Sequence, residues 1–196
     1  MAESTGFTRR HFLTVATAVT GGVGAIATAV PFALSFKPSA RAQALGAPVE
    51  VDVSKIELGA LLKVEWRGRL IYILRRSPQM LGELKKDEGL LRDPTSQDST
   101  QPSYAQNEHR SIRPEFLVME GVCTHLGCAP APRFEVAPVD LGPTWPGGFY
   151  CPCHGSKFDL AGRVFTGVPA PTNLAVPPYR FVNDSTIQIG SDTENS

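Results

Sequence analysis

The residues of this chain that are best suited to bind a metal lie in two short segments. All four cysteines and two of the four histidines fall within residues 123–128, which read CTHLGC, and residues 151–156, which read CPCHGS. Thiolate sulfur and imidazole nitrogen are ligands for zinc, iron and iron–sulfur clusters. Two loops of this kind, brought together, offer two thiolates and two imidazoles with two cysteines left over. The spacing therefore predicts a metal site.

Structural zinc is the first interpretation to consider, because two cysteines and two histidines form a common tetrahedral ligand set. In zinc fingers, however, the two cysteines are paired in one segment and the two histidines in another. Here each segment mixes the two ligand types, and zinc leaves Cys128 and Cys153 without a role. The pattern favours a different metal group, with zinc as an alternative.

The two segments, together with GVPAP at residues 167–171, resemble the Rieske iron–sulfur proteins of the cytochrome bc1 family of bacterial type. The resemblance implies a [2Fe–2S] cluster in which Cys123 and Cys151 hold one iron, and His125 and His154 hold the other. It implies a disulfide between Cys128 and Cys153. It also implies that the residues around the cluster are Leu126, Gly127, Gly155, Ser156, Phe158 and Pro169.

One of these positions departs from the family pattern. Two residues after the serine, high-potential members usually have a tyrosine whose hydroxyl donates a hydrogen bond to a ligand thiolate, whereas this chain has Phe158. The loss of one hydrogen bond is worth on the order of 1 kcal/mol, or roughly 40 mV for a one-electron couple. We therefore expect a reduction potential below that of the tyrosine-bearing relatives.

The resemblance also implies an activity. The chain would be the electron-transfer subunit of ubiquinol–cytochrome c reductase, an enzyme complex that supports proton translocation. Its cluster would take one electron from ubiquinol at cytochrome b, with His154 accepting a proton, and would pass the electron to the haem of cytochrome c1. The complex would be a dimer. The alternatives are an exported Rieske small subunit of a molybdenum oxidoreductase such as arsenite oxidase, and a soluble Rieske ferredoxin or oxygenase domain.

The amino terminus contains an export signal and an apolar segment. Arg9 and Arg10 begin a twin-arginine pattern within residues 1–11, and residues 12–36 contain no Asp, Glu, Lys or Arg. These 25 residues would span roughly 37 Å as a helix, which exceeds the ~30 Å of a bilayer core. We interpret the segment as a retained transmembrane helix; the alternative is a signal peptide cleaved near residues 40–42. The arginines predict a cytoplasmic amino terminus, with the remainder on the periplasmic side of the bacterial inner membrane.

The remaining residues predict a linker and a mostly β domain. Residues 37–48 are expected to be a flexible hinge, and residues 49–196 to be an antiparallel β-sandwich with a cluster-binding subdomain at about 120–172. Strand patterns at 62–66 and 70–74, and at 179–182 and 186–189, predict two hairpins. Residues 78–92 predict one short helical insertion, followed by a surface excursion at 93–113. Since 19 basic residues balance 19 acidic ones, we expect no nucleic-acid partner.

Overall fold

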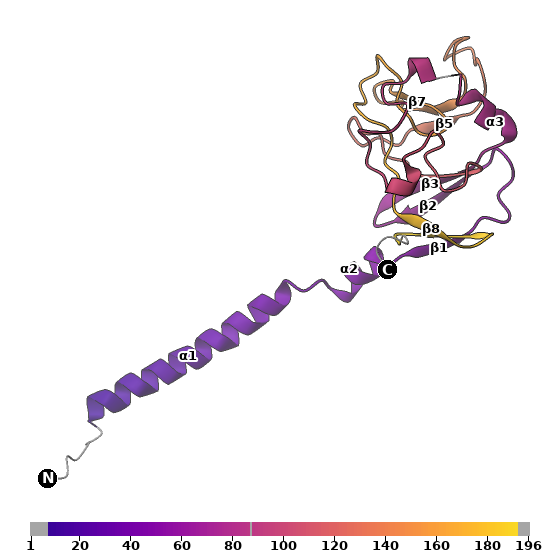
Figure 1. Ribbon diagram of the computed structural model, residues 1–196. Coiled ribbons are helices and arrows are strands. Elements are labelled where there is room, and N and C mark those ends of the chain that lie inside the picture. The colour runs from indigo at the N-terminus through magenta and orange to yellow at the C-terminus, as the bar shows by residue number, and fades with distance from the viewer. Residues whose placement is uncertain (1–7, 87, 192–196) are drawn as a thin grey trace. The chain divides into compact units, whose positions relative to one another are not determined.

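The computed structural model of the chain describes residues 8–86 and 88–191 (Figure 1). The chain divides into two compact units, residues 1–44 and 45–196. We refer to the second unit as the outer domain.

The first unit consists mainly of one long helix. Helix α1 covers Arg9–Ser35, and the side chain of Thr8 caps its amino end by accepting a hydrogen bond from the His11 N–H. No residue of α1 is buried, and among the described residues it is the helix that is long and apolar enough to cross a membrane. The predicted apolar helix is therefore present and begins three residues earlier than residue 12.

The predicted linker is more regular than expected. A second helix, α2, covers Ala40–Gly46, inside the segment 37–48 that we predicted to be flexible. The Ser39 hydroxyl accepts a hydrogen bond from the Ala42 N–H, which is the geometry of a helix N-cap. Alanine has the highest helix propensity of all residues. The alanine-rich composition that we interpreted as linker-like is therefore also the reason for the short helix.

The outer domain contains three antiparallel sheets of three strands each (Figure 1). The first has the order β1-β9-β8, the second β2-β3-β4 and the third β5-β6-β7. The strands are β1 Val49–Asp52, β2 Leu61–Trp66, β3 Arg69–Arg75, β4 Phe116–Glu120, β5 Ala131–Arg133, β6 Gly148–Tyr150, β7 Lys157–Phe158, β8 Tyr179–Asn183 and β9 Thr186–Ile189. The mostly β, antiparallel fold class and both predicted hairpins are confirmed.

The second sheet has a hydrophobic core on each of its faces. Successive side chains of a strand point to opposite faces of the sheet. On β3, Ile71 and Ile73 pack in a core with residues of β8 and β9, whereas Tyr72 and Leu74 pack in a core with Phe149 and the cysteines. This explains why the strand is a continuous apolar run in the sequence. The sheet therefore supports the Cys/His segments on one face and the β1-β9-β8 sheet on the other.

The helical insertion is shorter than predicted. Helix α3 covers only Pro78–Glu83, with Ser77 as its N-cap, and a 3₁₀ turn, η1, follows at Glu88–Leu90. Residue 87 lies outside the described residues. Gly82 disfavours helix by about 1 kcal/mol relative to alanine, and the chain beyond η1 is held by an antiparallel bridge between Leu91 and Phe165. The tertiary contact thus ends the helical pattern that the sequence predicted to continue to residue 92.

The segment 93–113 was predicted to be a surface excursion, and this prediction is only partly right, because exposed and buried residues alternate along it. It includes a 3₁₀ turn, η2, at Ser103–Ala105, and several of its side chains are buried, namely Asp93, Ser96, Ala105, Arg110 and Ser111. The buried carboxylate of Asp93 accepts hydrogen bonds from the Gln97 and Asp98 N–H groups and from the Ser99 hydroxyl. A polar segment can be buried when its polar groups are satisfied in this way.

Candidate metal centre

The first Cys/His segment, residues 123–128, forms a tight loop after strand β4. The N–H of Cys123 donates to the carbonyl of Cys128 at 2.8 Å, and the N–H of Gly127 donates to the carbonyl of Cys123 at 2.9 Å. Gly127 has φ of 84°, a left-handed conformation that glycine adopts without steric cost. The loop can close in this way because the residue four positions after Cys123 is a glycine.

The second segment, residues 151–156, forms a loop with the same hydrogen bonds. The N–H of Cys151 donates to the carbonyl of Ser156 at 2.8 Å, and the N–H of Gly155 donates to the carbonyl of Cys151 at 2.9 Å. Gly155 has φ of 77°. We call the two segments the first and second loops.

The structure brings the side chains of the two loops together. A disulfide joins Cys128 to Cys153, as the resemblance implied. The rings of His125 and His154 meet edge to face, with their centroids 4.7 Å apart. Cys123 and Cys151 are free thiols and are almost fully buried.

The two free thiols are neighbours in an apolar environment. Burial raises the pKa of the Cys123 thiol, and the adjacent thiol of Cys151 raises it further. The His125 N–H and the Ser156 hydroxyl are hydrogen-bonded to the same sulfur and act in the opposite direction. Two adjacent buried thiolates repel each other, and a metal cation between them removes this repulsion.

The histidines complete a donor set that fits an iron–sulfur cluster of the Rieske type. The Nδ1 atom of His125 is buried and has no hydrogen-bond partner in the described structure. Buried polar atoms are normally paired, so this atom is suited to ligate a metal. Two cysteines and two histidines, one of each from each loop, are the ligands of a Rieske [2Fe–2S] centre.

The geometry also contains a second group of sulfur atoms. The sulfurs of Cys128, Cys151 and Cys153 lie within 4.8 Å of one another. Because Cys128 and Cys153 are joined as a disulfide, neither can act as a thiolate ligand. The closeness of the three sulfurs therefore places the disulfide against Cys151 and does not form a separate metal site.

A third loop, residues 167–172, is tied to both Cys/His loops. The N–H of Ala170 donates to the Ser156 hydroxyl oxygen at 3.1 Å, and the Thr124 hydroxyl donates to the carbonyl of Thr172 at 2.7 Å. Pro169, which was predicted to lie next to the cluster, is exposed in this loop. Thr124 was missed by the sequence analysis, although it lies between the predicted ligands Cys123 and His125.

The other predicted residues take different positions. Leu126 is 70% exposed at the tip of the first loop, and His154 is also exposed. Phe158 is fully buried and belongs to the same core as Cys123 and Cys151. Arg9 and Arg10, the predicted export signal, begin helix α1.

Tyr72 is a supporting residue that the sequence analysis did not identify. Its hydroxyl donates to the carbonyl of Pro130 at 2.9 Å, and its ring stacks on Phe149 with centroids 5.8 Å apart. A Cβ at Gly121 would lie only 2.8 Å from the same ring. Tyr72 thus holds the chain just before and just after the first loop. The sequence offered no signal for this role beyond a polar hydroxyl within an apolar strand.

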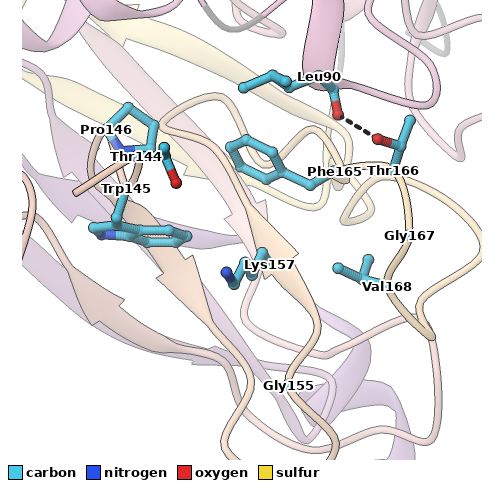
Figure 2. A pocket seen from close by; sticks show the side chains of 10 residues that line it. All are labelled: Leu90, Thr144, Trp145, Pro146, Gly155, Lys157, Phe165, Thr166, Gly167 and Val168. Atoms are coloured by element: carbon cyan, nitrogen blue, oxygen red, sulfur yellow. Dashed lines mark hydrogen bonds between the residues drawn. The ribbon is translucent and has the colours of Figure 1, made fainter. Parts of the chain in front are cut away.

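A hollow of about 350 Å³ lies beside the second loop (Figure 2). It is lined by Leu90, Thr144, Trp145, Pro146, Gly155, Lys157, Phe165, Thr166, Gly167 and Val168. Trp145 is buried, and its indole N–H donates to the carbonyl of Arg133 at 2.9 Å. Figure 2 also shows the Thr166 hydroxyl donating to the Leu90 carbonyl, which ties η1 to the residue just before the third loop.

Comparisons with known proteins agree with this geometry. A family model described as "Rieske [2Fe-2S] domain" matches residues 98–179, and one described as "Ubiquitinol-cytochrome C reductase Fe-S subunit TAT signal" matches residues 1–39. The ubiquinol-cytochrome c reductase iron-sulfur subunit of Allochromatium vinosum is 56% identical, over 97% of this chain and 92% of that protein. The chain belongs to the family of ubiquinol–cytochrome c reductase iron–sulfur subunits.

A further relative has the same name, and a solved chain is similar over most of its length. The corresponding subunit of Blastochloris viridis is 43% identical, over 94% of this chain and 93% of that protein. A solved chain titled "Hyperthermophilic respiratory Complex III" is 27% identical, covers 90% of this chain and 97% of that chain, and has a TM-score of 0.48.

Membership of this family confirms the [2Fe–2S] cofactor of Rieske type and the electron-transfer role that the sequence predicted. The export-signal match and the apolar helix α1 together indicate an exported protein with a membrane anchor. The relatives are iron–sulfur subunits of a reductase complex, and neither zinc nor the molybdenum-enzyme alternative is favoured.

Proposed function

We propose that Cys123 and Cys151 hold one iron of the [2Fe–2S] cluster and that His125 and His154 hold the other. The observation that carries this proposal is the meeting of two free, buried thiols and two histidine rings across the paired loops. When bound, such a cluster accepts and releases one electron at a potential above that of all-cysteine clusters. Ser156, Phe158 and the three loops would surround it.

The chain would act in a quinol–cytochrome c reductase as the subunit that moves one electron from ubiquinol to a cytochrome. The relatives are named for this reductase, which supports the proposal. His154 is exposed, so its imidazole can meet a quinol hydroxyl and accept its proton. Leu126, also exposed, would cover the cluster on the side that faces the solvent.

The remaining chain would allow the outer domain to reach two partners. Helix α1 would span the inner membrane with its amino end in the cytoplasm, and residues 37–48 would act as the hinge, with the short helix α2 inside it. The outer domain, on the periplasmic side, would then move between cytochrome b and cytochrome c1 within a dimeric complex. The export signal and the length of α1 support this arrangement.

Low-temperature EPR on membranes that contain the full-length chain tests the proposal. We expect a Rieske signal after reduction with ascorbate, and its loss in Cys151→Ser. A signal that appears only with dithionite would contradict the assignment to quinol oxidation. The matched control is Thr144→Val, at an exposed position in the lining of the hollow, which should leave the signal unchanged.

A further inference from the structure

Three arginine side chains lie inside the outer domain. Arg76, Arg110 and Arg163 are each 1% exposed or less. Lysine and arginine are almost never fully buried unless they are paired, because removing a charge from water is costly. The three guanidinium groups therefore require a physical explanation.

Their partners are mainly neutral. Only Arg163 has a close carboxylate, with its Nε 2.7 Å from Oδ2 of the equally buried Asp159. Arg76 donates to the Ser111 hydroxyl and to the carbonyls of His109, Pro114 and Leu160. Arg110 donates to the Gln101 side chain and to the carbonyls of Ala161, Gly162 and Leu174. Hydrogen bonds satisfy these two groups, but no ion pair neutralises them in the described structure.

The buried charges do not balance. The buried carboxylates of the described residues are Asp93, Glu120 and Asp159, and Glu120 is paired with Arg69, 2.6 Å away. Asp93 and Asp159 are therefore the two buried carboxylates that remain to balance the three buried arginines, which leaves an excess of one positive charge. Burial lowers the pKa of Arg76 to about 10, with Asp159 acting in the opposite direction, so the group remains charged at neutral pH.

The excess charge lies next to the core that contains the cysteines. Arg76 and Arg110 bond the carbonyls of Leu160 and Ala161, and these two residues pack in one hydrophobic core with Cys123 and Cys151. The guanidinium groups and the two thiols are all buried, and charges in a protein interior are screened far less than in water. Reduction of the cluster adds one negative charge near this core.

We propose that Arg76 and Arg110 raise the reduction potential of the cluster through their buried positive charge, without contacting it. The inference rests on the ligand assignment proposed above. The buried cations stabilise the reduced, more negative form relative to the oxidised form. Asp159 has the opposite effect, because its charge opposes the added electron. The segment 93–113, which supplies Arg110, thereby acquires a role in setting the potential.

The test is a redox titration of the EPR signal in full-length variants in membranes at pH 7. Arg76→Met removes the charge, and we expect the equilibrium constant for reduction of the cluster to fall roughly threefold to tenfold. At 59 mV for each factor of ten, the reduction potential should fall by roughly 30–60 mV. Arg76→Lys retains the charge but loses the forked hydrogen bonds, and should retain most of the potential. Arg67→Met removes an equal charge from an exposed turn and should leave the potential unchanged.

Asp159→Asn should change the reduction potential in the opposite direction. This second variant keeps the inference testable if Arg76→Met does not accumulate in the membrane. It removes a buried negative charge, so the potential should rise. Equal falls in Arg76→Met and Arg76→Lys, or a fall or no change in Asp159→Asn, would overturn the inference and indicate a packing role. The ligand assignment fails separately, because its failure is the absence of a Rieske signal in the wild-type chain.

Discussion

Gly127 and Gly155 occupy the same position in two different loops. Each lies four residues after a free, buried cysteine and donates its N–H to the carbonyl of that cysteine at 2.9 Å. Both have positive φ, at 84° and 77°. The two Cys/His loops are thus built as a pair, and each glycine closes the turn that directs a thiol inward.

Gly155→Ala should destabilise the second loop. A left-handed conformation costs an alanine roughly 1–2 kcal/mol, and Gly155 has φ of 77°. We expect the cluster absorbance to be lost at a lower temperature than in the wild type. Gly82→Ala in α3 is the control, because Gly82 has open space around its Cα and no positive φ, and alanine is the better helix former. Equal thermal stability of Gly155→Ala and the wild type would show that the loop does not need this conformation.

Phe158→Tyr should raise the reduction potential. Phe158 is fully buried in the core that contains Cys123 and Cys151, and we expect a hydroxyl added to its ring to donate to a ligand thiolate in that core. One such hydrogen bond is worth about 1 kcal/mol, or roughly 40 mV. The measurement is a redox titration monitored by EPR.

Phe158→Leu is the matched control for this substitution, because it changes the same side chain but adds no hydroxyl. It should not raise the potential. If Phe158→Tyr leaves the potential unchanged or lowers it, the hydrogen bond is not formed, and the expected difference from tyrosine-bearing relatives has another origin.

The parts of the fold that the sequence predicted best are those with local patterns. Residues 70–74 and 62–66 flank Arg67 and Gly68, which both have positive φ, and the chain forms the predicted hairpin there. The Cys/His spacing likewise predicted two metal-binding loops, and in both a glycine four residues after the cysteine allows the turn. Hydrophobic period and turn chemistry are sufficient for such elements.

The parts that the sequence did not predict depend on distant partners. Arg110 lies in a polar segment, which predicts a surface position. It is nevertheless buried, because carbonyls 51 to 64 positions further along the chain accept its hydrogen bonds. Tyr72 supports the first loop through Pro130, 58 positions away. No local pattern encodes these contacts, so the segment 93–113 was assigned to the surface.

Removal of the disulfide should destabilise the outer domain. The bond between Cys128 and Cys153 closes a loop with a sequence separation of 25, and loop-closure entropy predicts a stabilisation of about 3 kcal/mol. The double variant Cys128→Ser, Cys153→Ser should therefore unfold at a lower urea concentration. The wild-type chain treated with a reductant is the control and should shift in the same direction. A midpoint equal to that of the oxidised wild type would show that the loops are held by their other contacts.

Tyr179→Phe should change how stability depends on pH. Burial raises the pKa of Tyr179 to about 12, while the hydrogen bond from the Ile112 N–H and the charge of Arg76 act in the opposite direction. In the unfolded chain the phenol ionises near pH 10. Below pH 10 both states are protonated, and as the pH rises further the unfolded state releases its proton first. Stability contributed by the neutral phenol is therefore lost between pH 10 and about 12.

The wild type and Tyr179→Phe should consequently change order between pH 8 and pH 12. At pH 8 the variant should be less stable by about 1 kcal/mol, because the Ile112 N–H at 2.9 Å loses its acceptor. By pH 12 the wild type should have lost up to about 2.7 kcal/mol relative to the variant, at 1.36 kcal/mol for each pKa unit. Urea denaturation at both pH values measures the difference. A difference that stays constant with pH would mean that Tyr179 ionises equally in the folded and unfolded states.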